Sequence, residues 1–197
     1  MENGSIAQFL DDLQSQGRYA FTLEELRKSL QRKDSAIKAA LFRVLRKGFA
    51  ATVRKGFYVI VPPEYRVRGI IPPVLFVDDL MRYLGRAYYA GLLSAAALHG
   101  AGHQQPQEFH VVSGIPALRN ISAQGAGIRF FSKRNMPAGG IEEKKTDMGI
   151  IRVSSPELTA IDLVIFEKRI GGLGRAAEVI SELAERISPD QLAKLAE

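Results

Sequence analysis

The proline-rich segment PPEYRVRGIIPP, residues 62–73, constrains the fold of this chain more than any other stretch. It holds four prolines in twelve residues. Proline fixes the backbone angle φ and lacks an N–H donor, so we expect the segment to be neither a helix nor a central strand. Its stiffness predicts a semi-rigid linker. We therefore predict two domains, residues 1–63 and 74–197, joined by a linker at residues 64–73.

Three short amphipathic helices are predicted before this linker. Apolar residues recur at helical spacing in the first helix, which should end at Gly17. The second helix should start at Thr22, because Thr22 and Glu25 have the spacing of a capping box. Asp34 is expected to cap the third helix, and Gly48 to end it.

A hairpin follows in FAATVRKGFYVIVPP, residues 49–63. Two β-type runs flank Arg54, Lys55 and Gly56, and the glycine suits a tight turn. Three helices followed by a hairpin is the order of a winged helix-turn-helix, a DNA-binding domain. We therefore predict an α+β protein, with an N-terminal winged helix-turn-helix and a larger mixed α/β domain that has a small sheet and packed helices.

The positive charge is concentrated in the first third of the chain. Residues 1–70 hold 13 Lys and Arg against 7 Asp and Glu, whereas residues 71–197 hold 14 of each kind, so the net charge of +6 lies in the first part. This predicts a polyanionic partner, most simply nucleic acid. A surface charge that only aids solubility would explain it as well.

The third helix is the candidate recognition helix. With Ile37, Leu41, Val44 and Leu45 facing inward, its outer face carries small residues and cations, which suit close approach to base edges and phosphates. The predicted DNA contacts on and just after this helix are Ser35, Lys38, Ala39, Phe42, Arg43, Arg46 and Lys47. Arg54 and Lys55 at the hairpin tip are predicted to meet phosphates or the minor groove. A charged tip would also keep an exposed hairpin soluble.

The remainder of the chain predicts helices on one small sheet. Ser155 should cap a helix in SSPELTAIDLVIF, with Pro156 at its first position. The other predicted helices span residues 74–84, 88–99, 175–187 and 188 onward, and the predicted strands span residues 109–112, 128–132, 142–146 and 150–153.

Several motifs in this region have features of chemical sites. His99 and His103 have the spacing of a metal pair, but glycines beside them should end the helix at His99. Ser94 lacks the following glycine of a nucleophile elbow, which favours packing or a backbone hydrogen bond. The run GGLGRAAE lacks the lysine of a phosphate-binding loop, so a loop and helix start is expected. We predict no metal and no cofactor.

The strongest enzymatic alternative is a metal-dependent nuclease in IEEKKTD. Glu142 and Glu143 each precede a lysine by two positions, and Asp78 or Asp79 would have to supply a second acid. Alternating charges on an exposed strand pair explain the run equally well. A protein-interaction module that does not bind DNA is the other alternative.

Composition indicates a cytoplasmic protein. The chain has no cysteine, no apolar run of the roughly 18 residues that a membrane helix needs, and an acidic start unlike a signal peptide. We therefore predict no membrane partner.

Two segments make the chain similar to a known family. The basic N-terminal part is followed by YYAGLLSAAALHGAGHQQPQEFHVV and then by RVSSPELTAIDLV, and together these resemble the AbiEi antitoxins of type IV toxin–antitoxin systems. The matching positions are Tyr88, Tyr89, Ser94, Ala95, His99, Gly100, Gln105, Pro106, Val111, Ser155, Pro156, Glu157 and Asp162.

The resemblance implies a non-enzymatic repressor. It would bind inverted repeats in double-stranded operator DNA as a homodimer and repress its own operon. Its second domain would oppose a nucleotidyltransferase-like toxin without forming a stable complex. Family members often extend beyond this length, so we expect a short member or a shortened form.

Overall fold

The computed structural model describes residues 5–66, 71–101, 106–123, 126–146 and 149–197. The chain forms two compact units. The first comprises Met1–Gly85 with the short segments Ile121–Ala126 and Thr146–Gly149, and the second holds the rest. Each unit has a hydrophobic cluster of its own. The protein is thus of the α+β class, as predicted.

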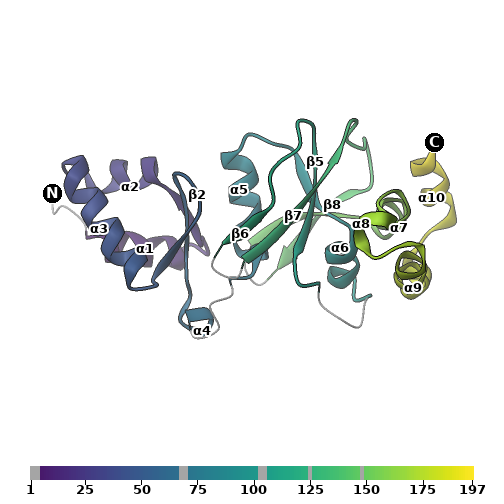
Figure 1. Cartoon of the computed structure of the whole chain (residues 1–197), viewed down its shortest axis with the longest axis horizontal. Coiled ribbons are helices and arrows are strands. Elements are labelled where there is room, and N and C mark those ends of the chain that lie inside the picture. Colours follow the sequence, from purple (N-terminus) through teal and green to yellow (C-terminus); the bar gives the residue numbers. More distant parts are fainter. Residues whose placement is uncertain (1–4, 67–70, 102–105, 124–125, 147–148) are drawn as a thin grey trace. The chain divides into compact units, whose positions relative to one another are not determined.

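The three predicted N-terminal helices are present (Figure 1). They are α1 (Ile6–Ser15), α2 (Leu23–Leu30) and α3 (Asp34–Arg46). The capping box is formed: the Thr22 amide donates to Glu25 Oε2 at 2.7 Å, and the Glu25 amide donates to Thr22 Oγ1 at 3.1 Å. These bonds satisfy amide donors that a helix start leaves without partners.

The cap predicted for α3 is wrong. Lys33 is the cap residue and makes no side-chain capping bond, while Asp34 is the first helical residue. The Asp34 carboxylate instead forms ion pairs with Arg27 and Lys38. Ion pairs to two cations replace the expected bond to a backbone amide.

The predicted hairpin is present and belongs to a three-stranded antiparallel sheet. Strands β1 (Ala20–Thr22), β2 (Ala50–Arg54) and β3 (Phe57–Ile60) lie in the order β1-β3-β2. The helices pack on this sheet through a shared core. Its buried members are Leu10, Leu13, Phe21, Leu26, Leu30, Ile37, Leu41, Val44, Ala50 and Ile60.

The segment after the hairpin corrects a second prediction. Residues Pro63–Arg66 form a short helix, α4, although the prolines were expected to prevent one. Pro63 is its first residue, where a missing N–H costs nothing. The short helix η1 (Pro73–Leu75) and α5 (Val77–Tyr83) follow, in place of one helix over residues 74–84. Both belong to the first unit, which therefore extends past the predicted linker.

The second unit is built on a mixed sheet. The strands of this unit lie in the order β7-β5-β4-β9-β8. The bounds are β4 (Tyr88–Ala90), β5 (Phe109–Gly114), β6 (Ile121–Ala123), β7 (Ala126–Lys133), β8 (Ile141–Thr146) and β9 (Gly149–Ser154). All four predicted strands are therefore found in one sheet.

The helix predicted over residues 88–99 is only partly right. Its first residues form β4, and helix α6 (Leu92–Leu98) starts after Gly91, whose backbone is extended. Strand β4 is antiparallel to β5 and parallel to β9, with Ala90 beside Val153. Because β4 lies between two strands, its backbone N–H and C=O groups have hydrogen-bond partners there. The small apolar residues of this segment do not reveal those partners.

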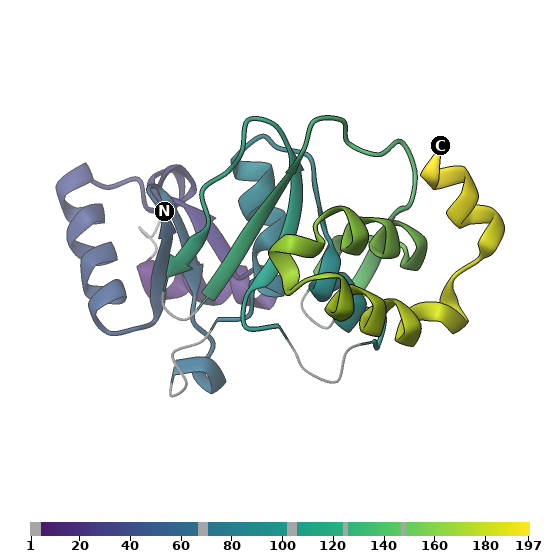
Figure 2. The ribbon, with the colours of Figure 1, turned by 45° about the vertical axis from the view of Figure 1, so that its right-hand side comes forward.

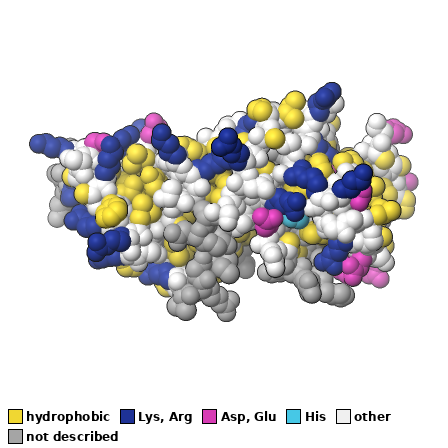
Figure 3. Space-filling view, in the orientation of Figure 1, with side chains coloured by type: hydrophobic (Ala, Val, Ile, Leu, Met, Phe, Trp, Pro, Cys, Tyr) yellow, Lys and Arg dark blue, Asp and Glu magenta, His cyan; other side chains and the backbone are white. Residues whose placement is uncertain are grey.

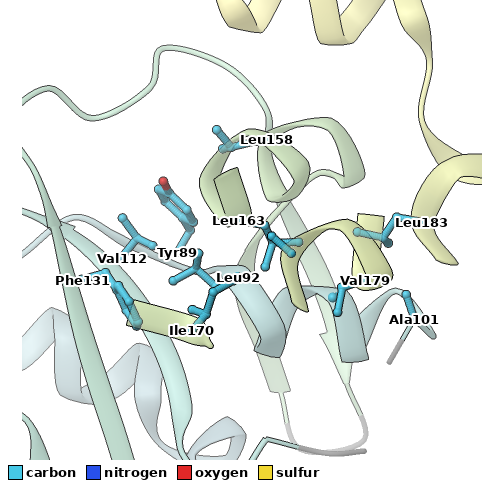
Figure 4. Close-up of a cluster of buried hydrophobic side chains, with 12 residues drawn as sticks. Tyr89, Leu92, Ala101, Val112, Phe131, Leu158, Leu163, Ile170, Val179 and Leu183 are labelled. Atoms are coloured by element: carbon cyan, nitrogen blue, oxygen red, sulfur yellow. The ribbon is translucent and has the colours of Figure 1, made fainter. Parts of the chain in front are cut away.

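Helices complete the second unit (Figure 2). They are α7 (Pro156–Ile165), α8 (Glu167–Ile170), α9 (Leu173–Leu183), η2 (Ala184–Arg186) and α10 (Pro189–Ala196). Ser155 caps α7 as predicted, accepting from the Leu158 amide at 3.3 Å. Helices α6, α7 and α9 pack on one another, and the core between helices and sheet includes Tyr89, Val112 and Phe131 (Figure 4). Among the described residues, no helix is long and apolar enough to cross a membrane.

Candidate nucleic-acid interface

Helix α3 has one buried and one exposed side. Ile37, Leu41 and Val44 are buried in the core of the first unit. These positions follow the helical repeat, so the opposite side is forced outward. The exposed side is therefore a direct consequence of the apolar spacing.

Five of the predicted contact residues share this exposed side. They are Ser35, Lys38, Ala39, Phe42 and Arg46. Phe42 stands out, because 62% of its surface is exposed although the side chain is large and apolar. The helix thus presents an aromatic ring among small and cationic side chains, a combination that can meet thymine methyl groups, base edges and phosphates.

The other two predicted residues of this segment lie on its flank. Arg43 and Lys47 line a cleft of about 360 Å³ between α1 and α3. The apolar part of the lining comes from Ile6, Leu10, Val44 and Ile60, among others. Figure 3 shows an apolar area on this unit with Lys and Arg side chains around it.

Arg66 is a cation of this cleft that the sequence analysis missed. It lines the cleft, its guanidinium lies 4.4 Å from the ring centroid of Phe49, and its Nε donates to the Val61 carbonyl at 3.1 Å. The sequence placed Arg66 in a linker, so no helical or strand pattern could assign it to a surface. The short helix α4 brings it there.

Asp34 is an acid on the same side of α3. Its Oδ2 lies 2.7 Å from Lys38 Nζ, and its Oδ1 lies 2.7 Å from Arg27 Nη2. Hydrogen bonds, first from Lys38 and then from Arg27, hold the pKa of the Asp34 carboxyl below its usual value. Asp34 is therefore a counterion of Lys38 within the protein itself. Arg27, on α2, is a second cation that the sequence analysis did not select.

The hairpin tip is fixed by helix α5. The Tyr83 hydroxyl donates to the Lys55 carbonyl at 3.1 Å, and the rings of Phe57 and Tyr83 lie 5.3 Å apart. Gly56 has φ of +80°, and a Cβ on it would lie 2.9 Å from Tyr83 Oη. Only glycine fits this position without strain. The backbone that carries Arg54 and Lys55 is thus held in place, with the Lys55 side chain exposed.

The motifs of the second unit have structural roles where the structure describes them. Ser94 Oγ accepts from the His110 amide at 2.8 Å, the backbone hydrogen bond that was predicted. His99 ends α6, and its Nε2 lies 2.7 Å from the Ser154 carbonyl. His103 lies outside the described residues. Gly172 precedes the first residue of α9, which agrees with a loop and helix start.

The nuclease alternative gains no support from the described residues. Lys144, on β8, donates to the Leu98 carbonyl, and Arg82 pairs with both Asp78 and Asp79 on α5. Among the residues the structure describes, no three His, Asp or Glu side chains are grouped so that they could hold a metal ion. A catalytic role for Glu142 or Glu143 in IEEKKTD stays a prediction.

Comparison with known proteins finds a matching family and a solved structure with a similar fold. The family described as the AbiEi antitoxin C-terminal domain matches residues 89–197. The crystal structure of the RV2827C protein from Mycobacterium tuberculosis is similar, with a TM-score of 0.67, 18% identity, and coverage of 96% of this chain and 70% of that one. At this identity the likeness shows the fold alone.

A more distant likeness is to an antigenic nucleotidyltransferase-like protein from Paracoccidioides brasiliensis. Its TM-score is 0.43 and its identity is 9%, with coverage of 59% of this chain and 75% of that one. This similarity is too low to support an inference. Among curated proteins, no sequence matches the chain.

Proposed function

The chain belongs to the AbiEi antitoxin family, and from this premise we propose that it is an antitoxin that also binds DNA and represses its own operon. In this proposal the first unit contains a winged helix-turn-helix, in which α3 enters the major groove and the β2-β3 hairpin is the wing. The partner of the second unit is a nucleotidyltransferase-like toxin, opposed without a stable complex. The protein itself is not an enzyme.

The observation that carries the DNA-binding proposal is the composition of the exposed side of α3. Ser35 and Ala39 are small enough to let the helix approach base edges, and Phe42 offers an apolar contact. Arg46 on this side and Arg43 on its flank offer donors for guanine or phosphate. The fixed hairpin tip adds Lys55, and the whole net charge of the chain lies in residues 1–70. The resemblance to the family adds the proposal that the partner is double-stranded operator DNA with inverted repeats, bound by a homodimer.

A mobility-shift titration against the DNA upstream of the gene tests the proposal. Binding should be much tighter to this DNA than to random DNA of equal length. Equal binding to both, or none, would favour a protein-interaction module. Incubation of labelled DNA with magnesium, using the wild type and Glu142→Gln, tests the nuclease alternative, because cleavage lost in the variant would support it.

Replacing both tip cations, Arg54→Ala with Lys55→Ala, is expected to weaken binding to all DNA sequences alike. Each lost phosphate contact should lower the slope of log K against log salt by about 0.9, so the double variant should lose up to about 2 units of slope. Titrations at several salt concentrations measure this. The paired control is Lys145→Ala with Arg152→Ala, two exposed cations of β8 and β9. An unchanged slope in the tip variant would remove the wing from the DNA contact.

Asp34→Asn is expected to tighten DNA binding. The substitution removes a negative charge from the candidate interface and releases Lys38 and Arg27 from their ion pairs. We expect about threefold to tenfold tighter binding to any DNA at low salt, with the gain shrinking at high salt. The control is Asp190→Asn, an exposed acid of α10. Weaker binding by Asp34→Asn would show that Asp34 orients Lys38 for DNA instead of competing with it.

A further inference from the structure

A second group of cations lies on the sheet of the second unit, apart from the DNA-binding proposal. His110 on β5 is the register neighbour of Arg129 on β7, and the two strands are parallel. Side chains of paired neighbours lie on the same face of a sheet, and so does that of Phe131, two residues after Arg129. Phe131 is in the core under the helices, so this is the helix-covered face.

Helix α8 adds a third cation to this group. The Arg169 guanidinium lies 4.2 Å from the ring centroid of Phe131, and that of Arg129 lies 5.6 Å from it. The His110 ring is 5.0 Å from the same ring. Two arginines and a histidine therefore surround one phenylalanine. Over β5 and β7, Figure 3 shows Lys and Arg side chains beside a histidine and an acidic side chain.

The charge of this group is poorly balanced by described residues. Arg129 pairs with Glu108, but Arg129 Nη1 and Glu108 Oε2 are 4.0 Å apart, which is the limit of an ion pair. Arg169 Nη2 donates to the Phe130 carbonyl at 3.0 Å, a neutral partner. Burial and then the charge of Arg129 lower the pKa of Arg169, as expected for two cations near each other. By contrast, Lys133 on the same strand is matched by the buried carboxylate of Asp162.

His110 adds an unused polar atom at this place. The side chain is 4% exposed, and its Nδ1 has no hydrogen-bond partner among the described residues. Burial, aided by Arg129 and Arg169, lowers the pKa of His110 to about 4, so the ring is neutral at neutral pH. An unpaired buried polar atom is unfavourable, because it has lost its hydrogen bonds to water and gained none in the protein. A ligand that hydrogen-bonds to it would remove this penalty.

We propose that Arg129, Arg169 and His110 form a phosphate-binding site, and that its ligand is a small phosphate ester. Guanidinium groups match phosphate oxygens in pairs of hydrogen bonds. Arg169 is exposed and Arg129 half-buried, so a ligand can reach both. Residues 71–197 carry equal numbers of acidic and basic residues, which leaves this local group without the extended basic track that a polynucleotide needs.

The site can be tested by titrating the full chain with sodium phosphate, adenosine monophosphate and adenosine. The imidazole nitrogen signals of His110, followed by NMR, report binding at the site in the wild type. Saturable shifts with the two phosphate probes, and none with adenosine, are expected. Shifts that rise linearly up to about 10 mM, or equal shifts with adenosine, would overturn the proposal.

Variants separate this site from general attraction of anions. Arg129→Gln and Arg169→Gln should each weaken binding of adenosine monophosphate by about tenfold or more, as measured by calorimetry. The matched control is Arg175→Gln, because Arg175 lies on α9 and pairs with Glu178. An equal loss in Arg175→Gln would contradict the site. The result does not depend on DNA binding, so either proposal can fail alone.

Discussion

Lys133→Ala is expected to lower the free energy of unfolding by about 3–5 kcal/mol, the largest effect on stability that we predict. Lys133 pairs with Asp162, whose side chain is fully buried and also accepts from the Tyr89 hydroxyl at 2.7 Å. Without Lys133, the carboxylate would be left as a buried charge with one neutral partner. Urea unfolding followed by circular dichroism measures the loss.

The loss should depend on pH in a defined direction. Burial raises the pKa of Asp162 above its usual value, while Lys133 opposes this rise. In Lys133→Ala the pKa should rise further, so the folded state takes up a proton more readily than the unfolded chain. Stability gained by protonation is present at low pH and is lost as pH rises through the folded pKa. The difference between variant and wild type should therefore shrink as pH falls below neutral.

Two controls isolate the ion pair in this experiment. Lys168→Ala removes an exposed lysine of α8 and should change stability by less than about 0.5 kcal/mol. The double variant Lys133→Met with Asp162→Asn leaves no buried charge and should regain part of the loss. A loss below about 1 kcal/mol in Lys133→Ala, unchanged between neutral and acid pH, would mean that the pair is open to water in solution.

The elements that the sequence predicted are those fixed by local rules. Helices α1 and α2 follow from apolar spacing and, at Thr22 and Glu25, from a capping box whose atoms are three residues apart. The hairpin follows from two β-type runs around Gly56, which has the positive φ that its turn requires. In each case the partners lie within a few residues, so the pattern is visible in the sequence.

The elements that were missed depend on partners far along the chain. Strand β1 has three residues and exists because it pairs with β3. The small apolar residues of β4 predict a helix, because the sequence does not show its neighbours β5 and β9. The same reason explains Asp34: its bond to Arg27 arises from the packing of α2 against α3. Three-residue strands and inter-helix ion pairs have no period of their own to detect.

The candidate sites divide in the same way. The exposed side of α3 could be predicted, because it is the complement of a buried stripe on one helix. The group around Phe131 could not, because His110 and Arg129 become neighbours only through the parallel register of β5 and β7, and Arg169 comes from α8. A sequence pattern can predict which face of a single helix or strand is exposed. It does not predict a site that is formed by residues of several elements.

Arg43→Ala is expected to reduce the preference for operator over random DNA by about tenfold to a hundredfold. A bidentate contact between arginine and guanine contributes about 1–3 kcal/mol of discrimination, and a substitution to alanine removes it. Lys38→Ala should have a smaller effect, because Lys38 is already paired with Asp34 in the free protein. Competition mobility shifts with operator and random duplexes measure both variants, and Lys194→Ala on α10 is the control.

The ratio of the two losses decides which role Arg43 has. A contact to a base weakens operator binding and leaves random DNA nearly unchanged, whereas a contact to phosphate weakens both equally and lowers the salt slope. Arg43 lies on the flank of α3 beside the cleft, while Arg46 lies on its exposed side. An equal loss on both duplexes would therefore assign Arg43 to the backbone and transfer base recognition to Arg46, whose alanine variant should then show the loss of discrimination.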